Sequence, residues 1–130
     1  MIPKFRAYDG GSLCRMYSPE EVMVGNGDIW IIDEDGVAGE WFVNNDLVLM
    51  QSTGLRDKNG KEIFEGDILG TKDGLLNGVV KFNIDLGMWT NSLLRYNNFE
   101  RLCSIANSRE IIGNIWEDGE LLDGENTEKN

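Results

Sequence analysis

Two acidic turns hold the residues best suited to chemistry in this sequence. Asp33-Glu34-Asp35-Gly36 and Asp57-Lys58-Asn59-Gly60 carry the oxygen ligands that calcium prefers. An EF-hand loop has glycine at its sixth position and glutamate at its twelfth, whereas glycine is the fourth residue of both turns. We therefore interpret both as solvated turns, and we predict no metal-ligating and no cofactor-binding residue.

The residue types for nucleophilic and acid–base catalysis are largely missing. The chain has no histidine, which excludes Ser-His-Asp and Cys-His arrangements. Its 23 acidic residues make many carboxylate pairs plausible, so no particular pair indicates glycosidase chemistry. The phosphate-binding patterns GxGxxG and GxxxxGKS/T are absent. The sequence therefore predicts no catalytic residue and favours a protein that is not an enzyme.

The two cysteines, Cys14 and Cys103, lie far apart in sequence and outside any CxxC pattern. Zinc sites and thiol redox centres need closely spaced cysteines, so neither is expected. We expect two reduced, unbridged thiols packed as small apolar groups, as in the cytoplasm of a bacterial host cell. No apolar run approaches the ~18 residues that span a bilayer, which predicts a cytoplasmic protein with no membrane partner.

Charge is unevenly distributed along the chain. The net charge is −11, and residues 16–55 contain eight acidic residues and no Lys or Arg. A negative field repels a phosphate backbone, so we expect no direct binding to nucleic acid. The field suits a protein partner with a basic surface, although solubility alone also accounts for it. The densest acidic cluster, Asp33, Glu34 and Asp35, is assigned to a candidate interaction surface.

Tryptophan side chains form the second part of this candidate surface. Aromatic residues anchor protein interfaces because they bury a large area with few rotamers to freeze. Of the four tryptophans, we assign Trp41 and Trp89 to the candidate surface. For each of them, packing against neighbouring strands is the favoured alternative.

The pattern of glycines and apolar runs predicts a mainly β fold. Sixteen glycines punctuate short apolar runs that are rich in β-branched and aromatic residues. Residues 5–8 and 13–17 are expected to form an opening hairpin. Residues 29–32 and 40–43 are expected to form a second strand pair, and residues 47–50 a further strand.

One or two short helices are also predicted. Ser18-Pro19-Glu20-Glu21 combines an N-cap serine, a proline at the first helical position and a glutamate three residues after the cap. Gly25-Asn26-Gly27 is expected to end this helix after one or two turns. Residues 98–103 are interpreted as a second short helix that covers one end of a barrel.

The central segment, residues 51–82, has the turn chemistry of a small β-barrel. Asn59 and Gly60 tolerate the positive φ of a tight turn, and Gly66-Asp67 predicts a corner between two strands. A corner aspartate can accept hydrogen bonds from nearby backbone N–H groups. This succession of corner, strand and turn is typical of SH3-like barrels, and we expect consecutive strands throughout the segment.

Three blocks of sequence resemble the YopX family of small phage and prophage proteins. They are residues 4–8 (KFRAY), residues 53–69 (TGLRDKNGKEIFEGDIL) and residues 111–117 (IIGNIWE). The resemblance extends from about Pro3 to Leu122. It implies an SH3-like small β-barrel with additional N-terminal hairpins, and a viral or prophage origin. It implies no activity, so no catalytic or ligand-binding residue follows from it.

Residues 1–122 are accordingly expected to form a single YopX-like domain, followed by a flexible acidic tail at residues 123–130. The favoured function is a phage or prophage accessory protein that acts as a non-enzymatic interaction module, because β-rich domains offer edge strands and aromatic grooves to partners. Its partner would be an unidentified, basic protein or a second copy of the chain. The alternative is an acidic decoy that imitates nucleic acid and occupies a basic host protein.

Overall fold

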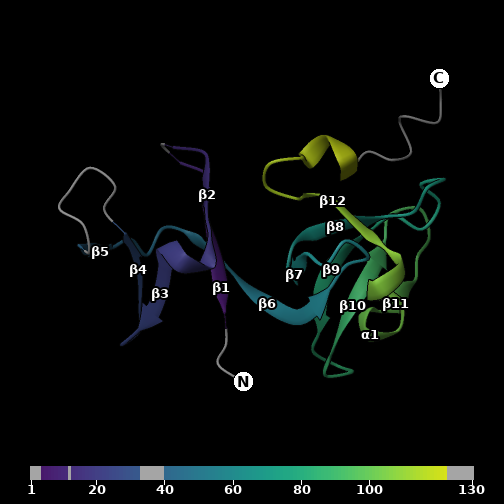
Figure 1. Ribbon diagram of the computed structural model, residues 1–130, viewed down its shortest axis with the longest axis horizontal. Helices are drawn as coiled ribbons and strands as arrows, with labels where there is room; N and C mark the ends of the chain where they lie inside the picture. Colours follow the sequence, from purple (N-terminus) through teal and green to yellow (C-terminus); the bar gives the residue numbers. More distant parts are fainter. Residues whose placement is uncertain (1–3, 12, 33–39, 123–130) are drawn as a thin grey trace. The chain divides into compact units, whose positions relative to one another are not determined.

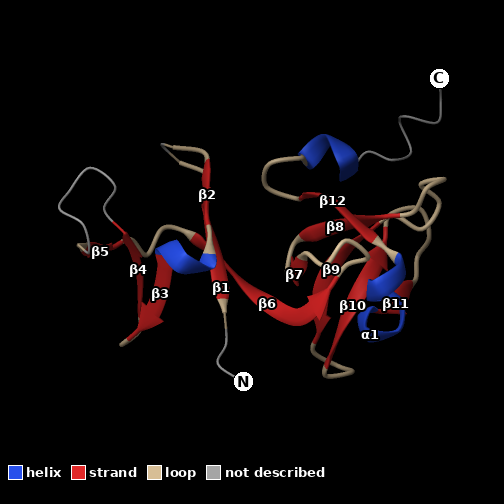
Figure 2. Ribbon diagram, in the orientation of Figure 1, coloured by secondary structure: helices blue, strands red, loops and turns tan. Residues whose placement is uncertain are grey.

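The computed structural model describes residues 4–11, 13–32 and 40–122. This part of the chain is mainly β, as predicted, with short helices (Figure 1, Figure 2). The chain divides into two compact units, Met1–Ser52 (unit 1) and Thr53–Asn130 (unit 2). The expected domain, residues 1–122, spans unit 1 and the described part of unit 2, and the expected tail at residues 123–130 lies outside the described residues.

Unit 1 is built from short antiparallel strands. In chain order its elements are β1 (Phe5–Asp9), β2 (Arg15–Tyr17), a 3-10 helix (Pro19–Glu21), β3 (Val22–Gly25), β4 (Asp28–Ile32), β5 (Trp41–Val43) and β6 (Val48–Arg56), which continues into unit 2. β1 pairs with β2 and with the first part of β6. β3, β4 and β5 form a separate three-stranded sheet in that order. The core consists of Ala7, Tyr17, Val22, Ile31 and Leu47.

The first hairpin and the second strand pair are confirmed, but the first helix is shorter than predicted. The Glu21 carboxylate accepts hydrogen bonds from the Ser18 N–H at 3.0 Å and from its hydroxyl at 3.1 Å, which fits the predicted helix start. The helix ends at Glu21, and Gly25-Asn26-Gly27 is a hairpin turn between β3 and β4 instead of a helix end. The reason is that the β-branched residues of β3 pair with β4, which outweighs the local helix signal.

Unit 2 contains a curled antiparallel sheet with the strand order β11-β10-β9-β8-β12 (Figure 2). Its elements in chain order are β7 (Glu62–Phe64), β8 (Asp67–Gly70), β9 (Gly78–Asn83), β10 (Met88–Leu93), β11 (Phe99–Arg101), α1 (Leu102–Ile105), a 3-10 helix (Ala106–Ser108), β12 (Glu110–Asn114) and a second 3-10 helix (Gly119–Leu122). β7 is not part of this sheet; it pairs with β6 in the four-stranded sheet β2-β1-β6-β7. The core consists of Ile63, Leu69, Val80, Leu102 and Ala106.

The predicted strands and corner of the central segment are confirmed. β6, β7, β8 and β9 follow one another through residues 51–82. Gly66 has φ of +87°, and the Asp67 carboxylate, only 1% exposed, accepts the Phe64 N–H at 2.7 Å. This left-handed backbone is one that glycine adopts without strain, so the corner depends on Gly66 as well as on Asp67.

Two predictions are wrong: the short helix at residues 98–103 and the packing of the two cysteines in an apolar environment. Phe99–Arg101 form strand β11, and α1 begins only at Leu102. The reason is that β11 pairs with β10 while the Leu102 side chain fills the core. Cys14 and Cys103 are free thiols, and both are exposed instead of packed as small apolar groups.

Candidate functional site

The residues predicted to form one interaction surface lie in different parts of the chain and have different surroundings. Asp33, Glu34 and Asp35 lie outside the described residues. Trp89, on β10 of unit 2, packs edge-to-face on Phe82 with ring centroids 5.2 Å apart and contacts the core, which is the packing alternative. Trp41, on β5 of unit 1, belongs to a different kind of surface.

One face of the β3-β4-β5 sheet carries apolar side chains at all of its paired positions except the turn end, where Gly25 pairs with Asp28. Residues that lie directly opposite each other in an antiparallel pair share a face. Met23 pairs with Trp30, which pairs with Val43, and Ile32 pairs with Trp41. Because alternate residues of a strand share a face, all five belong to one surface. We call these residues, Met23, Trp30, Ile32, Trp41 and Val43, the apolar face.

The opposite face of the same sheet already supplies the core of unit 1. Val22 and Ile31 point to that side and are 9% and 1% exposed. On the apolar face Met23 is 48% and Val43 is 41% exposed, and the other three residues are half-buried. Toward the ends of its strands the core side also has exposed residues, Val24 at 42% and Phe42 at 44%. An antiparallel sheet with one face on a core ordinarily has a polar outer face. An exposed apolar patch of this kind marks an interaction site more often than a single exposed side chain does.

Sequence reasoning found Trp41 but missed the rest of the apolar face. Its signal is present in the chain, because residues 22–24, 29–32 and 41–43 are apolar at consecutive positions. Consecutive apolar residues in a strand indicate that both faces are apolar. Only the pairing of β3, β4 and β5, however, brings these residues onto one surface.

The charges near this sheet are negative. Glu40, which precedes β5, and Asp46 are exposed, and Asp28 begins β4. Arg15, the nearest cation before residues 16–55 in the sequence, contacts Glu21 at 2.5 Å and lies over the Tyr17 ring at 4.5 Å. The apolar face therefore lies in a segment whose own residues offer a partner only negative charge.

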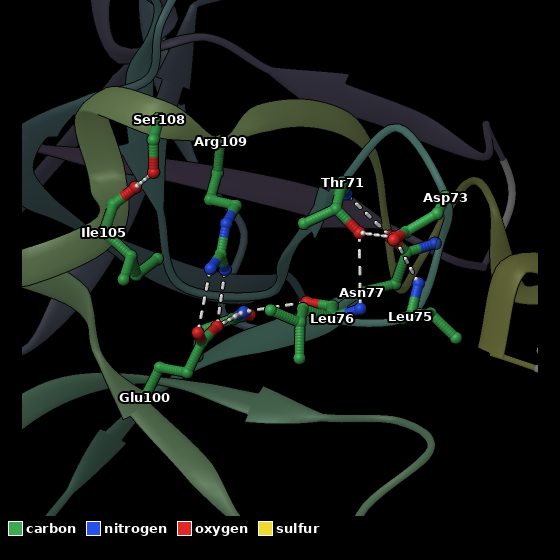
Figure 3. Close-up of polar contacts among 10 residues, drawn as sticks. Thr71, Asp73, Leu75, Leu76, Asn77, Glu100, Ile105, Ser108 and Arg109 are labelled. Carbon is green, nitrogen blue, oxygen red and sulfur yellow. Dashed lines mark hydrogen bonds and ion pairs between the residues drawn. The ribbon is translucent and has the colours of Figure 1, made fainter.

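Unit 2 contains a shallow pocket of about 290 Å³ with polar groups on its wall, including Lys58, Thr71, Ser108 and Glu110. The Ser108 hydroxyl donates to the Ile105 carbonyl at 2.9 Å, and the Thr71 hydroxyl donates to Asp73 at 2.9 Å (Figure 3). The Lys58 Nζ lies 3.9 Å from Glu110 Oε1. These groups are hydrogen-bonded or paired within the protein, so each of them has a structural role in the pocket wall.

A buried polar cluster lies next to the core of unit 2. Arg109 Nη2 donates to Glu100 Oε2 at 2.8 Å (Figure 3). Asn91 Nδ2 donates to Glu100 Oε1 at 3.0 Å. The hydrogen bonds from Arg109, opposed by burial and reinforced by Asn91, hold the pKa of the Glu100 carboxyl below its usual range. The cluster joins β10 and β11 to the start of β12, which is a structural task.

The residues of the family-like blocks also have structural tasks. Asp57 is 4% exposed, and its carboxylate accepts the N–H groups of Asn59 at 2.9 Å, Lys61 at 2.9 Å and Ile111 at 3.0 Å. It thereby fastens its turn to β12. Asn114 Oδ1 likewise accepts the N–H groups of Trp116 and Glu117. The residues of the family-like blocks therefore specify hydrogen bonds that stabilise the fold. This role explains why the blocks are long although they suggest no catalytic group.

Metal and membrane sites can be assessed only for the described parts of the chain. Within residues 4–11, 13–32 and 40–122, no three Asp, Glu or Cys side chains are placed to share a metal ion. Over the same ranges, every helix is too short or too polar to cross a bilayer.

The fold and this pattern of structural residues define a small antiparallel β protein of two units. The sequence profile described as YopX protein matches residues 4–123, and the chain belongs to the YopX family. It resembles the crystal structure of protein EF1440 from Enterococcus faecalis, with 28% identity, a TM-score of 0.57, and coverage of 95% of this chain and 99% of that one. It also resembles yopX from Bacillus subtilis, with 16% identity, a TM-score of 0.58, and coverage of 92% and 98%. None of the curated proteins matches the chain.

Proposed function

We propose that this protein is a non-enzymatic interaction module of phage or prophage origin that acts in the cytoplasm of its bacterial host. The observation that carries the proposal is the apolar face of unit 1, whose residues Met23 and Val43 are 48% and 41% exposed. Burying such residues against a partner protein is favourable by about 25 cal/mol for each Å² of apolar surface removed from water. The two tryptophans of this face supply the kind of side chain that anchors interfaces.

The alternative function, an acidic decoy, is less well supported by the described residues. A decoy needs carboxylates that are free to imitate a row of phosphates. In unit 1, Glu21 is paired with Arg15, and Asp28 accepts the Asn45 side-chain amide at 2.9 Å. The sheet surface that these residues border is apolar, which suits a protein partner better than imitation of nucleic acid.

Affinity capture from a bacterial lysate with matched surface variants tests the proposal. A Met23→Ser/Val43→Ser variant removes two exposed apolar side chains of the apolar face. Ile84→Ser is the matched control, because Ile84 is 83% exposed in unit 2. A partner retained by the wild type and by Ile84→Ser should be lost with the double variant. Equal retention by all three proteins would assign binding to another surface.

A further inference from the structure

β5 is the end strand of the β3-β4-β5 sheet. Asn44, directly after β5, donates its N–H to the Ile29 carbonyl at 2.8 Å, which extends the pairing between β4 and β5. Backbone groups alternate between the two sides of a strand, so Phe42 and Asn44 direct theirs toward β4. The N–H and C=O groups of Trp41 and Val43 therefore point away from β4. In the described ranges, no strand pairs with that side of β5.

The same two residues contribute to the apolar face. Trp41 and Val43 thus present side chains on one surface of the sheet and open backbone groups at its edge. An extended peptide can join such an edge as an additional strand, with main-chain hydrogen bonds for affinity and alternate side chains for specificity. Every second side chain of that peptide would lie next to the apolar face.

The other side chains of an added strand would meet different chemistry. Phe42 lies on the opposite face of β5 and is 44% exposed. Glu40, directly before β5, is exposed and brings a carboxylate to the beginning of this edge. A Lys or Arg can lay its aliphatic stem along an aromatic ring and bring its charge to a carboxylate. Residues 16–55 contain no Lys or Arg that could take this role within the same segment.

We propose that β5 binds an extended segment of another protein as an additional strand, in which apolar residues alternate with Lys or Arg. The inference rests on the proposed function and names the partner of the same surface. A second copy of this chain is the less favourable occupant. Pairing β5 with another β5 would bring two acid-only segments together, and like charges across an interface oppose association.

The first test uses two synthetic nine-residue peptides, one alternating lysine with valine and one alternating glutamate with valine. Binding to the full chain is followed by tryptophan fluorescence and titration calorimetry. The lysine peptide should bind, with an affinity that falls as salt rises, and the glutamate peptide should not. Equal binding of both peptides, or binding of neither, overturns the proposal, as does dimerisation of the unliganded chain in sedimentation experiments.

Two variants of the full chain separate strand addition from simple contact with the apolar face. Val43→Pro removes an edge N–H that β4 does not use, and proline is tolerated in edge strands. It should weaken the lysine peptide about tenfold, the effect of losing a main-chain hydrogen bond at a strand edge. Glu40→Lys, at an exposed position, should weaken the lysine peptide and create measurable binding of the glutamate peptide. If Glu40→Lys prefers the lysine peptide over the glutamate peptide as strongly as the wild type does, the proposal is wrong. This outcome decides the question even if Val43→Pro fails to fold.

Retention of the lysate partner by the same variants separates strand addition at β5 from the proposed function as an interaction module. If Met23→Ser/Val43→Ser loses the partner while Val43→Pro and Glu40→Lys keep it, strand addition is wrong and the interaction module remains. If the double serine variant keeps the partner, the proposed function fails at this surface. Loss of the partner in all three variants supports both.

Discussion

Replacing Asp57 with alanine tests whether the family-like central block holds the fold of unit 2. The substitution deprives three backbone N–H groups of their acceptor, those of Asn59, Lys61 and Ile111. Asn59 and Lys61 are exposed turn residues, so water can replace part of the lost bonding, at about 0.5 to 1 kcal/mol each. Ile111 is half-buried on β12, and its N–H loses a charged partner, at about 2 kcal/mol. We expect Asp57→Ala to lower the free energy of unfolding by about 3 to 4 kcal/mol.

The same contacts predict how this loss depends on pH. Burial alone would raise the pKa of the Asp57 carboxyl, but the N–H donors of Ile111, Lys61 and Asn59 outweigh burial and place the pKa below its usual value. A carboxyl whose pKa is lower in the folded state stabilises the fold above the unfolded-state pKa of about 3.9. That contribution is lost as the pH falls through the lower, folded-state pKa. The difference between wild type and Asp57→Ala should therefore be constant from about pH 5 upward and shrink below about pH 4.

The assay is urea unfolding followed by tryptophan fluorescence at several pH values, with Asp73→Ala as the matched control. Asp73 accepts the Leu75 N–H at 3.0 Å and the Thr71 hydroxyl at 2.9 Å, but it lies in an exposed loop. Its replacement should cost clearly less than that of Asp57. Equal losses in the two variants, or a difference that does not change with pH, would refute the reasoning about Asp57.

Three further outcomes are expected. Gly78→Ala should lower the free energy of unfolding by about 1 to 3 kcal/mol, because a methyl group there would lie 2.4 Å from a buried amide oxygen; urea unfolding measures the loss. Arg109→Met should cost about 3 kcal/mol by the same measurement, because it leaves the Glu100 carboxylate without its charged partner. A thiol assay under denaturing, non-reducing conditions should count two reactive groups, Cys14 and Cys103, and both should also react in the native protein.

The two stability predictions each have a control variant. Gly119→Ala introduces a methyl group into open space and should leave stability within about 0.5 kcal/mol. Adding Glu100→Gln to Arg109→Met removes the stranded charge and should restore part of the lost stability. Equal effects at Gly78 and Gly119, no recovery in the double variant, or a thiol count of zero would contradict the corresponding prediction.

The features that sequence reasoning predicted depend on neighbouring residues. The Ser18 and Glu21 pair is three residues apart, and the Gly66-Asp67 corner uses an acceptor three residues from its donor, Phe64. The strand sequence of residues 51–82 follows from turn residues and short apolar runs. Local chemistry of this kind can be read without knowing which strands pair.

The features that were missed depend on distant pairing. β3 and β11 carry local patterns that also fit helix boundaries, and pairing with β4 and β10 decides their structure. The apolar face exists only because three separate segments align in one register. Asp57 lies in an evident turn, but its acceptor role toward Ile111 crosses 54 residues of sequence.

The position of β12 has a consequence for the order of folding. β8, β9, β10 and β11 are neighbours both in sequence and in the sheet, whereas β12 returns to the open side of β8, where Glu110 pairs with Gly70. Hairpins between successive strands form in about 1–10 μs, but closing a long loop delays a non-local pairing. During this interval the edge of β8 is open to strands of other molecules. Aggregation during refolding should therefore compete chiefly with the docking of β12, and crowded or warm conditions would penalise this late step first.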